Sequence, residues 1–498
     1  MVSHPAEFPG GCSQTGRELA SSRLSLGPRL CYALHLVAMA EPEKLERGLG
    51  LAEATSLNMT FMVGIGPFVV IPFVVKAMGG PQSLIAWLTG AILALFDGCI
   101  WAELGAALPQ AGGSYVFLRE AYGAGRWGRL MSFLYIWQTL FQGPLSIASG
   151  ALGFANYSTY LTGDPTATNS ASPLLSSHLE KAVAAGIVIL AVVLLYRRIA
   201  TVGKMSIALC IVVVATILWL IYGGVTHFHA SLLHFSVPMA SLNFSWLLAA
   251  ALGHATVQTV YSYLGYYNVC NLGGEMKNPE RNIPRAIFIS IIAIALLYFA
   301  MQTSILGVIP WQEAASTKAV VSLFVARVFG SRWAQFFTVL ILISAFGSIF
   351  SATLGYSRIP YAAALDGNFF SIFARVHPTK RFPHISLLAL GATAVVFCLS
   401  LSLIDAIRAI LAMRCLIQFI GQAVGLMILR RRWGAERLPF RMWFYPLPVI
   451  VAILGWIGIF LATGRTPVLA SLAAMTIGIL VYLGRARYER RWPFEEVA

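Results

Sequence analysis

A glycine- and proline-rich stretch at residues 62–72, MVGIGPFVVIP, lies inside an apolar run long enough to cross a bilayer. Proline removes a backbone donor and clashes with the preceding turn, and glycine has no side chain to enforce helical dihedrals. We therefore expect this helix to be interrupted. Backbone groups freed at membrane depth are tolerated only where protein or a wet cavity satisfies them. The interruption predicts a binding site, and the alternative is a proline-kinked helix that packs through small residues.

A second stretch of this kind begins at residue 255, ATVQTVYSYLGYYNVCNLGGEMKNPERNIPRAI. Gly265 lies among four tyrosines that cannot all share one helical face, so some hydroxyls must find a partner inside the protein. The two interrupted spans are five apart in the order of expected spans. Discontinuous helices that begin the two halves of an inverted five-helix repeat have this spacing and frame a midplane site. The second interruption favours the binding site over the kink.

Ionisable side chains inside the expected spans are candidates for ion coupling. A carboxylate at the bilayer centre costs roughly 2.5–3.5 kcal/mol, so Asp97 should face the protein interior or be protonated. It is either a proton-coupling group or a structural hydrogen-bond partner of a neighbouring helix. His254, which we expect to be buried, titrates near neutrality when unperturbed or serves as a neutral hydrogen-bonded residue. Glu103 lies six residues beyond Asp97, where we expect headgroup water to reduce the free-energy cost of its charge.

The composition is that of an integral membrane protein, because the 498 residues are 58% hydrophobic and 11% charged, with a mean hydropathy of +0.75. A membrane-spanning helix needs about 20 apolar residues. Runs of about this length or longer number twelve, at 55–78, 83–107, 129–160, 180–198, 203–224, 244–274, 284–309, 332–363, 385–404, 406–429, 443–463 and 467–484.

The positive charge follows the pattern expected of membrane topology. Of the 35 lysines and arginines, most lie in alternate connecting segments, as they do in the short cytoplasmic loops of membrane proteins. Both termini are therefore expected in the cytoplasm. The net charge of +15 then needs no nucleic-acid partner.

The cysteines and histidines indicate neither a disulfide framework nor a metal site. The seven cysteines are scattered and form no CxxC pair, which is the spacing such sites use. Three histidines lie close together, and we interpret them as part of a solvated outer loop rather than a metal site: His227, His229 and His234.

Four motifs in order resemble the amino acid–polyamine–organocation permeases, of the bacterial amino acid permease type. They are GIG in the first span, WAELGAALPQAGGSYVFLREAYG after the second, YSYLGYY…GGEMKNPERNIPRAI through the sixth, and SAFGSIFSATLGYSRIPYAAALDGNFFSIFARVHPTKRFP through the eighth. The resemblance covers about residues 50–485. It implies an all-α fold of twelve spans with a five-plus-five inverted, LeuT-like repeat, in which helices 1 and 6 are discontinuous. It also implies amino acid transport by alternating access.

The resemblance implies particular backbone contacts to an amino acid. The amides of Gly64, Ile65 and Gly66 would bind the carboxylate, and the carbonyl of Met62 would face the amino group. Helix N-termini attract anions and C-terminal carbonyls attract cations, which agrees with these roles.

In the sixth span the family pattern falls on residues 261–265, YSYLG. Tyr261 would be an aromatic lid, Ser262 and Leu264 would offer carbonyls to the amine, and Gly265 would mark the break. Ordinary core packing is the alternative for the tyrosines.

The resemblance leaves the coupling ion open, because this chain departs from the family at three places. Tyr267 and the Gly274–Glu275 pair replace acidic residues that the family often has, and Val213 stands where known proton-coupled members carry a lysine. Three routes remain: protonation of Asp97 or His254, Na⁺ near Ser344 and Ser348, or uncoupled exchange. No other cofactor is expected.

The cytoplasmic gate is expected at the ends of the sixth and eighth spans. The candidates for its ion pairs are Glu275, Lys277, Arg281 and Arg358, and the alternative is helix capping plus topology-setting charge.

The expected organisation has four parts. A partly disordered cytoplasmic extension (1–50) precedes a transport core (51–430), helices 11 and 12 (431–485) and a cytoplasmic tail (486–498). Beginning the chain at Met39 would shorten the extension.

We expect a non-enzymatic secondary transporter in the plasma membrane that carries neutral zwitterionic amino acids by symport or exchange. A polyamine or organic amine antiporter is the alternative within the family. A channel would need a continuous ring of polar groups, and an intramembrane hydrolase would need a motif such as HExxH or GxSxG, which the chain lacks. The partners expected are the amino acid and the lipid bilayer, and nothing in the sequence identifies a partner subunit.

Overall fold

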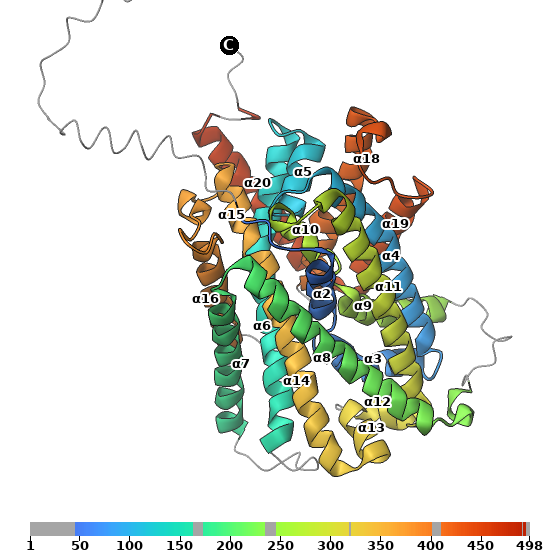
Figure 1. Ribbon diagram of the computed structural model, residues 1–498. Coiled ribbons are helices and arrows are strands. Elements are labelled where there is room, and N and C mark those ends of the chain that lie inside the picture. The colour runs from blue at the N-terminus through green and yellow to red at the C-terminus, as the bar shows by residue number, and fades with distance from the viewer. Residues whose placement is uncertain are drawn as a thin grey trace, which may run out of the picture. The chain divides into compact units, whose positions relative to one another are not determined.

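Helices account for nearly all regular structure in the computed structural model (Figure 1). The structure describes residues 45–162, 173–234, 246–317, 320–400, 410–490 and 492–494. Within these residues there are two isolated β-bridges and no longer strand. Most of the expected extension over residues 1–50, including Met39, lies outside the described residues.

The helices of the first half follow the expected apolar runs closely. They are α2 (Leu51–Met62), α3 (Gly66–Met78), α4 (Ser83–Ala107), α5 (Ser114–Tyr122), α6 (Trp127–Thr162), α7 (Pro173–Leu195), α8 (Ile199–Thr226) and the short η1 (Ala230–Leu233).

The second half begins with the other interrupted stretch. Its helices are α9 (Trp246–Tyr263), α10 (Asn268–Asn271), η3 (Gly273–Glu275), α11 (Pro279–Leu306), α12 (Trp311–Ser316), α13 (Val320–Phe329), α14 (Ser331–Tyr356), α15 (Arg358–Leu365), η4 (Ser371–Ala374), α16 (His384–Ser400), η5 (Cys415–Gly421), α18 (Gln422–Trp433), η6 (Ala435–Arg437), α19 (Leu447–Ala462) and α20 (Arg465–Tyr488).

The expectation of an all-α membrane protein is confirmed. Among the described residues, seven helices are long and apolar enough to cross a membrane, or eight if the bent pair α2 and α3 counts as one span. Each of the twelve apolar runs of the sequence contains or overlaps a helix, although α16 and α19 are shorter than the membrane-spanning length.

Local sequence explains where several of these helices begin and end. Pro67 lies in the first turn of α3, where its missing N–H costs nothing. Gly79 ends α3 at φ 70°, the left-handed conformation that glycine adopts without a steric penalty. The expected turn before α5 is built by Gly112 and Gly113, both with positive φ.

The two interrupted segments lie in the middle of the packing. α2 packs against α8, α11 and α14, while α3 packs against α9 and α4 packs against α11. Figure 1 shows α2 near the centre of the ribbon, with α5, α15 and α18 towards its upper end and α12 and α13 at its lower end. The helix that the sequence predicts to be broken is therefore enclosed by protein rather than lipid.

Candidate functional site

The first interruption frees three consecutive backbone donors. α2 ends at Met62, α3 begins at Gly66, and the two helices are bent by 46°. Val63 N still donates to Met59 O at 2.9 Å, but no described residue accepts a hydrogen bond from the N–H of Gly64, Ile65 or Gly66. These donors lie at the N-terminal end of α3, where the helix dipole favours negative charge.

The second interruption follows α9 and lies directly against the first. Gly265 has φ +129°, a conformation that L side chains rarely adopt, and a β-carbon there would lie 3.0 Å from Met62 N and from Phe61 Cγ. A β-carbon on Gly66 would lie 3.2 Å from Tyr261 Cε1. The glycines therefore allow the two broken helices to approach one another closely.

The carbonyls expected to face an amino group converge on one hydroxyl. Tyr298 Oη on α11 lies 2.8 Å from Met62 O and 3.2 Å from Ser262 O. A hydroxyl donates a single hydrogen bond, so it serves one carbonyl at a time and leaves acceptor capacity on the other. The sequence analysis missed Tyr298, although a tyrosine inside an apolar span needs a polar partner.

A cavity of about 60 Å³ lies between the two interruptions. A water molecule needs roughly 10–15 Å³ of such space, so a few atoms of a small polar ligand fit. The lining residues come from both broken segments and from three further helical segments: Phe61, Met62, Gly64, Ile65, Gly66, Ser146, Ser149, Gly150, Tyr261, Ser262, Leu264, Ser348, Ile410 and Arg414. Seven of the eight residues predicted to bind substrate are among them, and Gly265 packs beside Met62.

A larger hollow lies elsewhere. It measures about 590 Å³, is open to the surface and is lined by residues of α7, α8 and α16, by the connection between α7 and α8, and by Lys380. It touches neither interruption, so we do not assign it to the substrate.

Asn58 joins the two broken segments from within α2. Its Nδ2 donates to Tyr266 O at 2.6 Å and its Oδ1 accepts from Val269 N at 3.0 Å, and the residue is fully buried. One amide side chain thus satisfies a donor and an acceptor that the break leaves without helical partners. The sequence analysis missed this residue, and its only signal was a polar side chain within an apolar helix.

The two serines considered for a Na⁺ site differ in their surroundings. Ser348 Oγ donates to Phe61 O at 2.9 Å and lines the cavity. Ser344 Oγ donates to Leu340 O at 3.0 Å within its own helix. Only Ser348 therefore contacts the interrupted segment.

Asp97 does not line the cavity but is joined to the second interruption through Tyr266. It is 1% exposed, its Oδ2 accepts from Tyr266 Oη at 2.5 Å, and its Oδ1 accepts from Trp456 Nε1 at 3.0 Å. Asp97 thus faces the protein interior, as expected from the free-energy cost of a carboxylate in lipid. One carboxylate oxygen is hydrogen-bonded to the second interruption and the other to α19.

His254 was expected to be buried, and this expectation is wrong. Its side chain is exposed on α9 and does not line the cavity. His254 lies two turns before Tyr261 on nearly the same face of α9, so its exposure follows from its place along the helix rather than from the rotation of the helix.

Tyr267 connects the second interruption to a cation that the sequence analysis missed. Its side chain is fully buried, stacks on Trp101 at a centroid distance of 4.6 Å, and accepts a hydrogen bond from Arg414 Nη1 at 2.6 Å. Arg414 was detectable as one of two arginines, with Arg408, inside the apolar run 406–429, because ionisable residues at membrane depth mark functional sites.

Two of the expected gate residues form an ion pair. Arg358 donates through Nη2 and Nε to the carboxylate of Glu275 at 2.7 and 3.0 Å, and the two side chains are 2% and 0% exposed. Lys277 and Arg281 are exposed and form none of the ion pairs found among the described residues. The expected gate is thus reduced to Glu275 and Arg358.

Backbone bonds join the same region to the start of α2. Gly48 N and Leu49 N both donate to Glu275 O at 3.1 Å, and Lys277 N donates to Leu49 O at 2.8 Å. The segment before α2 is therefore tied to the segment that carries Glu275.

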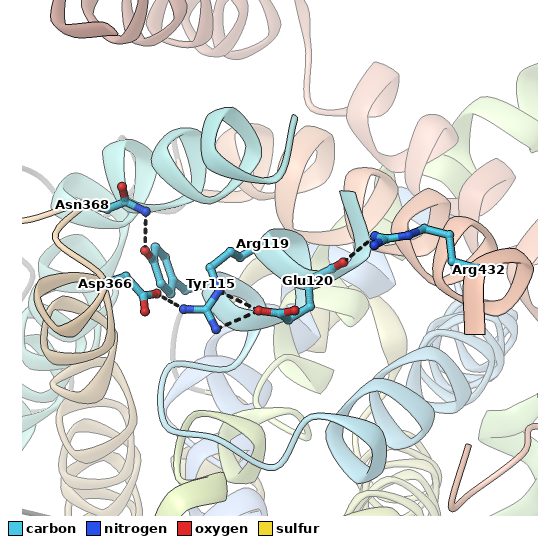
Figure 2. A network of polar contacts seen from close by, with 6 residues as sticks. All are labelled: Tyr115, Arg119, Glu120, Asp366, Asn368 and Arg432. Carbon is cyan, nitrogen blue, oxygen red and sulfur yellow. Dashed lines mark hydrogen bonds and ion pairs between the residues drawn. The ribbon is translucent and has the colours of Figure 1, made fainter. Parts of the chain in front are cut away.

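A further polar network fastens α5 to two other elements (Figure 2). Arg119 forms ion pairs with Glu120 and with Asp366, which follows α15. Arg432 Nη1 of α18 donates to Glu120 O at 3.0 Å, and Asn368 Nδ2 donates to Tyr115 Oη at 2.6 Å. Burial would lower the pKa of Arg119, but the Asp366 and Glu120 carboxylates raise it, so the pairs persist at neutral pH.

Glu103 is not placed in headgroup water as we expected. It is fully buried, and its carboxylate accepts hydrogen bonds from Arg430 at 2.5 and 2.6 Å and from Met442 N at 2.8 Å. An ion pair with backbone support replaces the expected hydration. Sequence spacing could not show this pair, because 327 positions separate its members.

These features define a class of protein: a multi-pass helical membrane protein whose two broken helices surround a small polar cavity, as in secondary transporters. The chain belongs to the amino acid permease family, whose model matches residues 49–482. This confirms the resemblance to the amino acid–polyamine–organocation permeases.

Relatives in this family differ in the substrates that their names give. The chain is 27% identical to the serine/threonine exchanger SteT of Bacillus subtilis over 460 residues, 90% of this chain and 96% of that protein. It is 23% identical to the branched-chain amino acid permease BcaP of the same organism over 456 residues, 90% of this chain and 95% of that protein. It is 28% identical to human cationic amino acid transporter 4 over 419 residues, 81% of this chain, and spans 63% of that protein's length.

Proposed function

We propose that this protein is a secondary active permease that carries α-amino acids across the plasma membrane by alternating access. The observation that carries the proposal is the meeting of two opposite sets of backbone groups at one cavity. The donors at Gly64–Gly66 suit a carboxylate, and the carbonyls of Met62 and Ser262 suit an ammonium group. An α-amino acid bears both groups on one carbon.

The relatives support recognition of the zwitterion by the backbone. Their names include serine, threonine, branched-chain and cationic amino acids, so the shared chemistry is the α-amino and α-carboxylate pair rather than any side chain. Backbone groups recognise that pair whatever the surrounding side chains are. Variation in the rest of the cavity can then change the substrate.

We further propose twelve crossings in the five-plus-five inverted repeat. The core would be residues 51–430, helices 11 and 12 would be residues 431–485, and the tail would be residues 486–498. Spans 1, 2, 6 and 7 would move as a bundle against spans 3, 4, 8 and 9. The dense packing among α2, α3, α4, α9 and α11 supports the composition of the bundle.

Both termini are proposed to be cytoplasmic, because the lysine- and arginine-rich connections would then all lie inside. Reporter fusions after Arg375 and Gly434 should be active only with a cytoplasmic reporter, and fusions after His227 and Gly464 only with an external one. The reverse pattern would refute this topology.

Coupling is proposed to use a proton on Asp97, with Na⁺ near Ser348 or uncoupled exchange as alternatives. Asp97 is a buried carboxylate whose partner Tyr266 belongs to the second interruption, so a change in its charge would act on the substrate segment directly.

Transport by purified protein in liposomes tests the proposed function. We expect saturable uptake of labelled amino acid that unlabelled substrate inside the vesicles accelerates. Currents without saturation would indicate a channel. Absence of uptake for every common amino acid, with protein that is folded and inserted, would refute the proposal.

A further inference from the structure

Arg414 contributes a positive charge to the wall of the substrate cavity. It lines the cavity together with Ile410, Ser146 and Ser149, and it is 2% exposed. It lies immediately before the π-helix Cys415–Gly421, a rare element that is frequently found at functional sites.

Neutral groups hold the guanidinium in place. Nη1 donates to Tyr267 Oη at 2.6 Å, and Nη2 donates to Ser146 Oγ at 2.7 Å and to Tyr356 Oη at 2.5 Å. With its amide oxygen turned towards Arg414, Gln142 accepts from Nε at 2.7 Å. A guanidinium has five N–H groups, so one N–H on Nη1 has no acceptor among these partners.

The charge itself has no counter-charge among the described residues. The ion pairs that they form all lie elsewhere, and none includes Arg414. Burying a cation without an anion is costly even when its hydrogen bonds are made. An anion that enters the cavity would remove this cost and would gain charge-assisted hydrogen bonds.

The α-carboxylate of a substrate does not need this arginine, because the free donors at Gly64–Gly66 can bind it. The α-amino group has the Met62 and Ser262 carbonyls. What remains unmatched at the cavity wall is a single positive charge, and a second carboxylate, on the substrate side chain, would match it. A cationic side chain would instead be repelled.

Building on the proposed function, we propose that Arg414 selects acidic amino acids, aspartate or glutamate, by binding their side-chain carboxylate. The sequence-based expectation of neutral rather than cationic substrates depended on there being no anionic side chain near the site, and it did not consider a cation such as Arg414. Arg414 itself lines the cavity, so a side-chain carboxylate that enters the cavity can contact the guanidinium.

Isosteric pairs of amino acids test the proposal on the wild-type protein in liposomes. Aspartate and asparagine differ in charge but hardly in size, as do glutamate and glutamine. We expect the acidic member of a pair to inhibit uptake of a labelled amino acid at concentrations at least about tenfold lower than its amide does. It should also raise the melting temperature of the protein in detergent at concentrations at least about tenfold lower than its amide does. Equal potency of acid and amide, or better inhibition by the amide, overturns the proposal.

Substitutions then test the residue itself. Arg414→Gln should abolish the preference for the acid, Arg414→Lys should keep part of it, and Arg487→Gln, which removes an exposed arginine of α20, should leave it unchanged. Retention of the full preference by Arg414→Gln would overturn the proposal. If Arg414→Gln does not fold, the wild-type isostere comparison decides alone.

The failure of this inference is distinguishable from failure of the proposed function. Uptake of neutral amino acids without acidic ones would refute only the role of Arg414. Absence of all amino acid uptake would refute the permease itself.

Discussion

Tyr298 bridges two residues that line the cavity, Met62 and Ser262, through one hydroxyl. Its hydroxyl lies within hydrogen-bond distance of Met62 O and Ser262 O, which belong to different broken segments. The ring is fully buried and packs edge-on against Trp87 at a centroid distance of 5.3 Å. It thus couples the positions of the two segments to the rigid wall formed by α4 and α11.

Removing this hydroxyl should weaken substrate binding. A typical hydrogen bond contributes about 1 kcal/mol, so we expect Tyr298→Phe to raise the KM for uptake roughly fivefold with little change in folding. Tyr263→Phe is the matched control, because Tyr263 donates to Trp87 O at 3.2 Å without touching a cavity carbonyl. A similar KM for both variants would contradict this role of Tyr298.

Replacing Asp97 should separate exchange from accumulation. Asparagine has the same shape, and the Tyr266 hydroxyl can turn to accept from its amide, so we expect Asp97→Asn to fold. Without a group that binds a proton, it should retain counterflow exchange and lose accumulation driven by a pH gradient. Accumulation equal to that of the wild-type protein would exclude Asp97 as the coupling group, and the measurement is uptake with and without an imposed gradient.

Broken helices, rather than individual side chains, give the site its chemistry. A continuous helix would use the N–H groups of Gly64–Gly66 internally, and the cavity would lose these backbone donors. Glycine is required where the breaks meet, since Gly265 combines a positive φ with a 3.0 Å approach to Met62 N. Asn58 then ties α2 to the second segment.

A methyl group at Gly265 should disrupt this contact. Strain of this kind costs roughly 1–3 kcal/mol, so we expect Gly265→Ala to lower the melting temperature and to abolish most uptake. Gly458→Ala on α19 is the control, because a β-carbon there meets nothing within 4 Å. Wild-type uptake by Gly265→Ala would show that the close approach is not needed for transport.

Across the whole molecule, one end of the bundle is closed by polar contacts between distant parts of the chain. These contacts are the Glu275–Arg358 pair, the backbone bonds to Leu49 and the network around Arg119. An alternating-access cycle must break some of them. The Glu275–Arg358 pair lies closest to the second interruption along the chain and is the strongest candidate.

Breaking the pair should open this end of the molecule. Removing one member of a buried ion pair costs roughly 3–5 kcal/mol, so we expect Glu275→Gln and Arg358→Gln to lose stability and transport. The double exchange Glu275→Arg with Arg358→Glu should restore part of both. Labelling of Cys270, which is buried in α10, by an impermeant maleimide in inside-out vesicles should increase in the single variants, as peptide mass spectrometry can show.

Unchanged labelling of Cys270, together with normal uptake, would remove Glu275 and Arg358 from the gate. Loss of uptake without increased labelling would assign the pair to stability alone. Arg327→Gln serves as the control, because its pair with Glu313 is 41% and 38% exposed and exposed pairs contribute little.

The membrane helices and both interruptions could be read from the chain, because they depend on local properties. Apolar run length sets where a helix crosses, and glycine and proline act on the backbone at their own position. The residues around Gly64 and Gly265 were found for this reason. The partners of buried charges could not be found in the same way, because Glu103 and Arg430 are 327 positions apart.

Arg414 shows most clearly what packing adds. Its place in an apolar run was visible in the sequence, but whether it met a carboxylate, lipid or a cavity depended on the rotation of its helix relative to α6, α10 and α14. Helix rotation is the sum of many weak side-chain contacts between distant segments, and no local pattern encodes it. The amino-acid order therefore established a broken-helix membrane protein, whereas the side-chain chemistry of its cavity emerged only from the assembled helices.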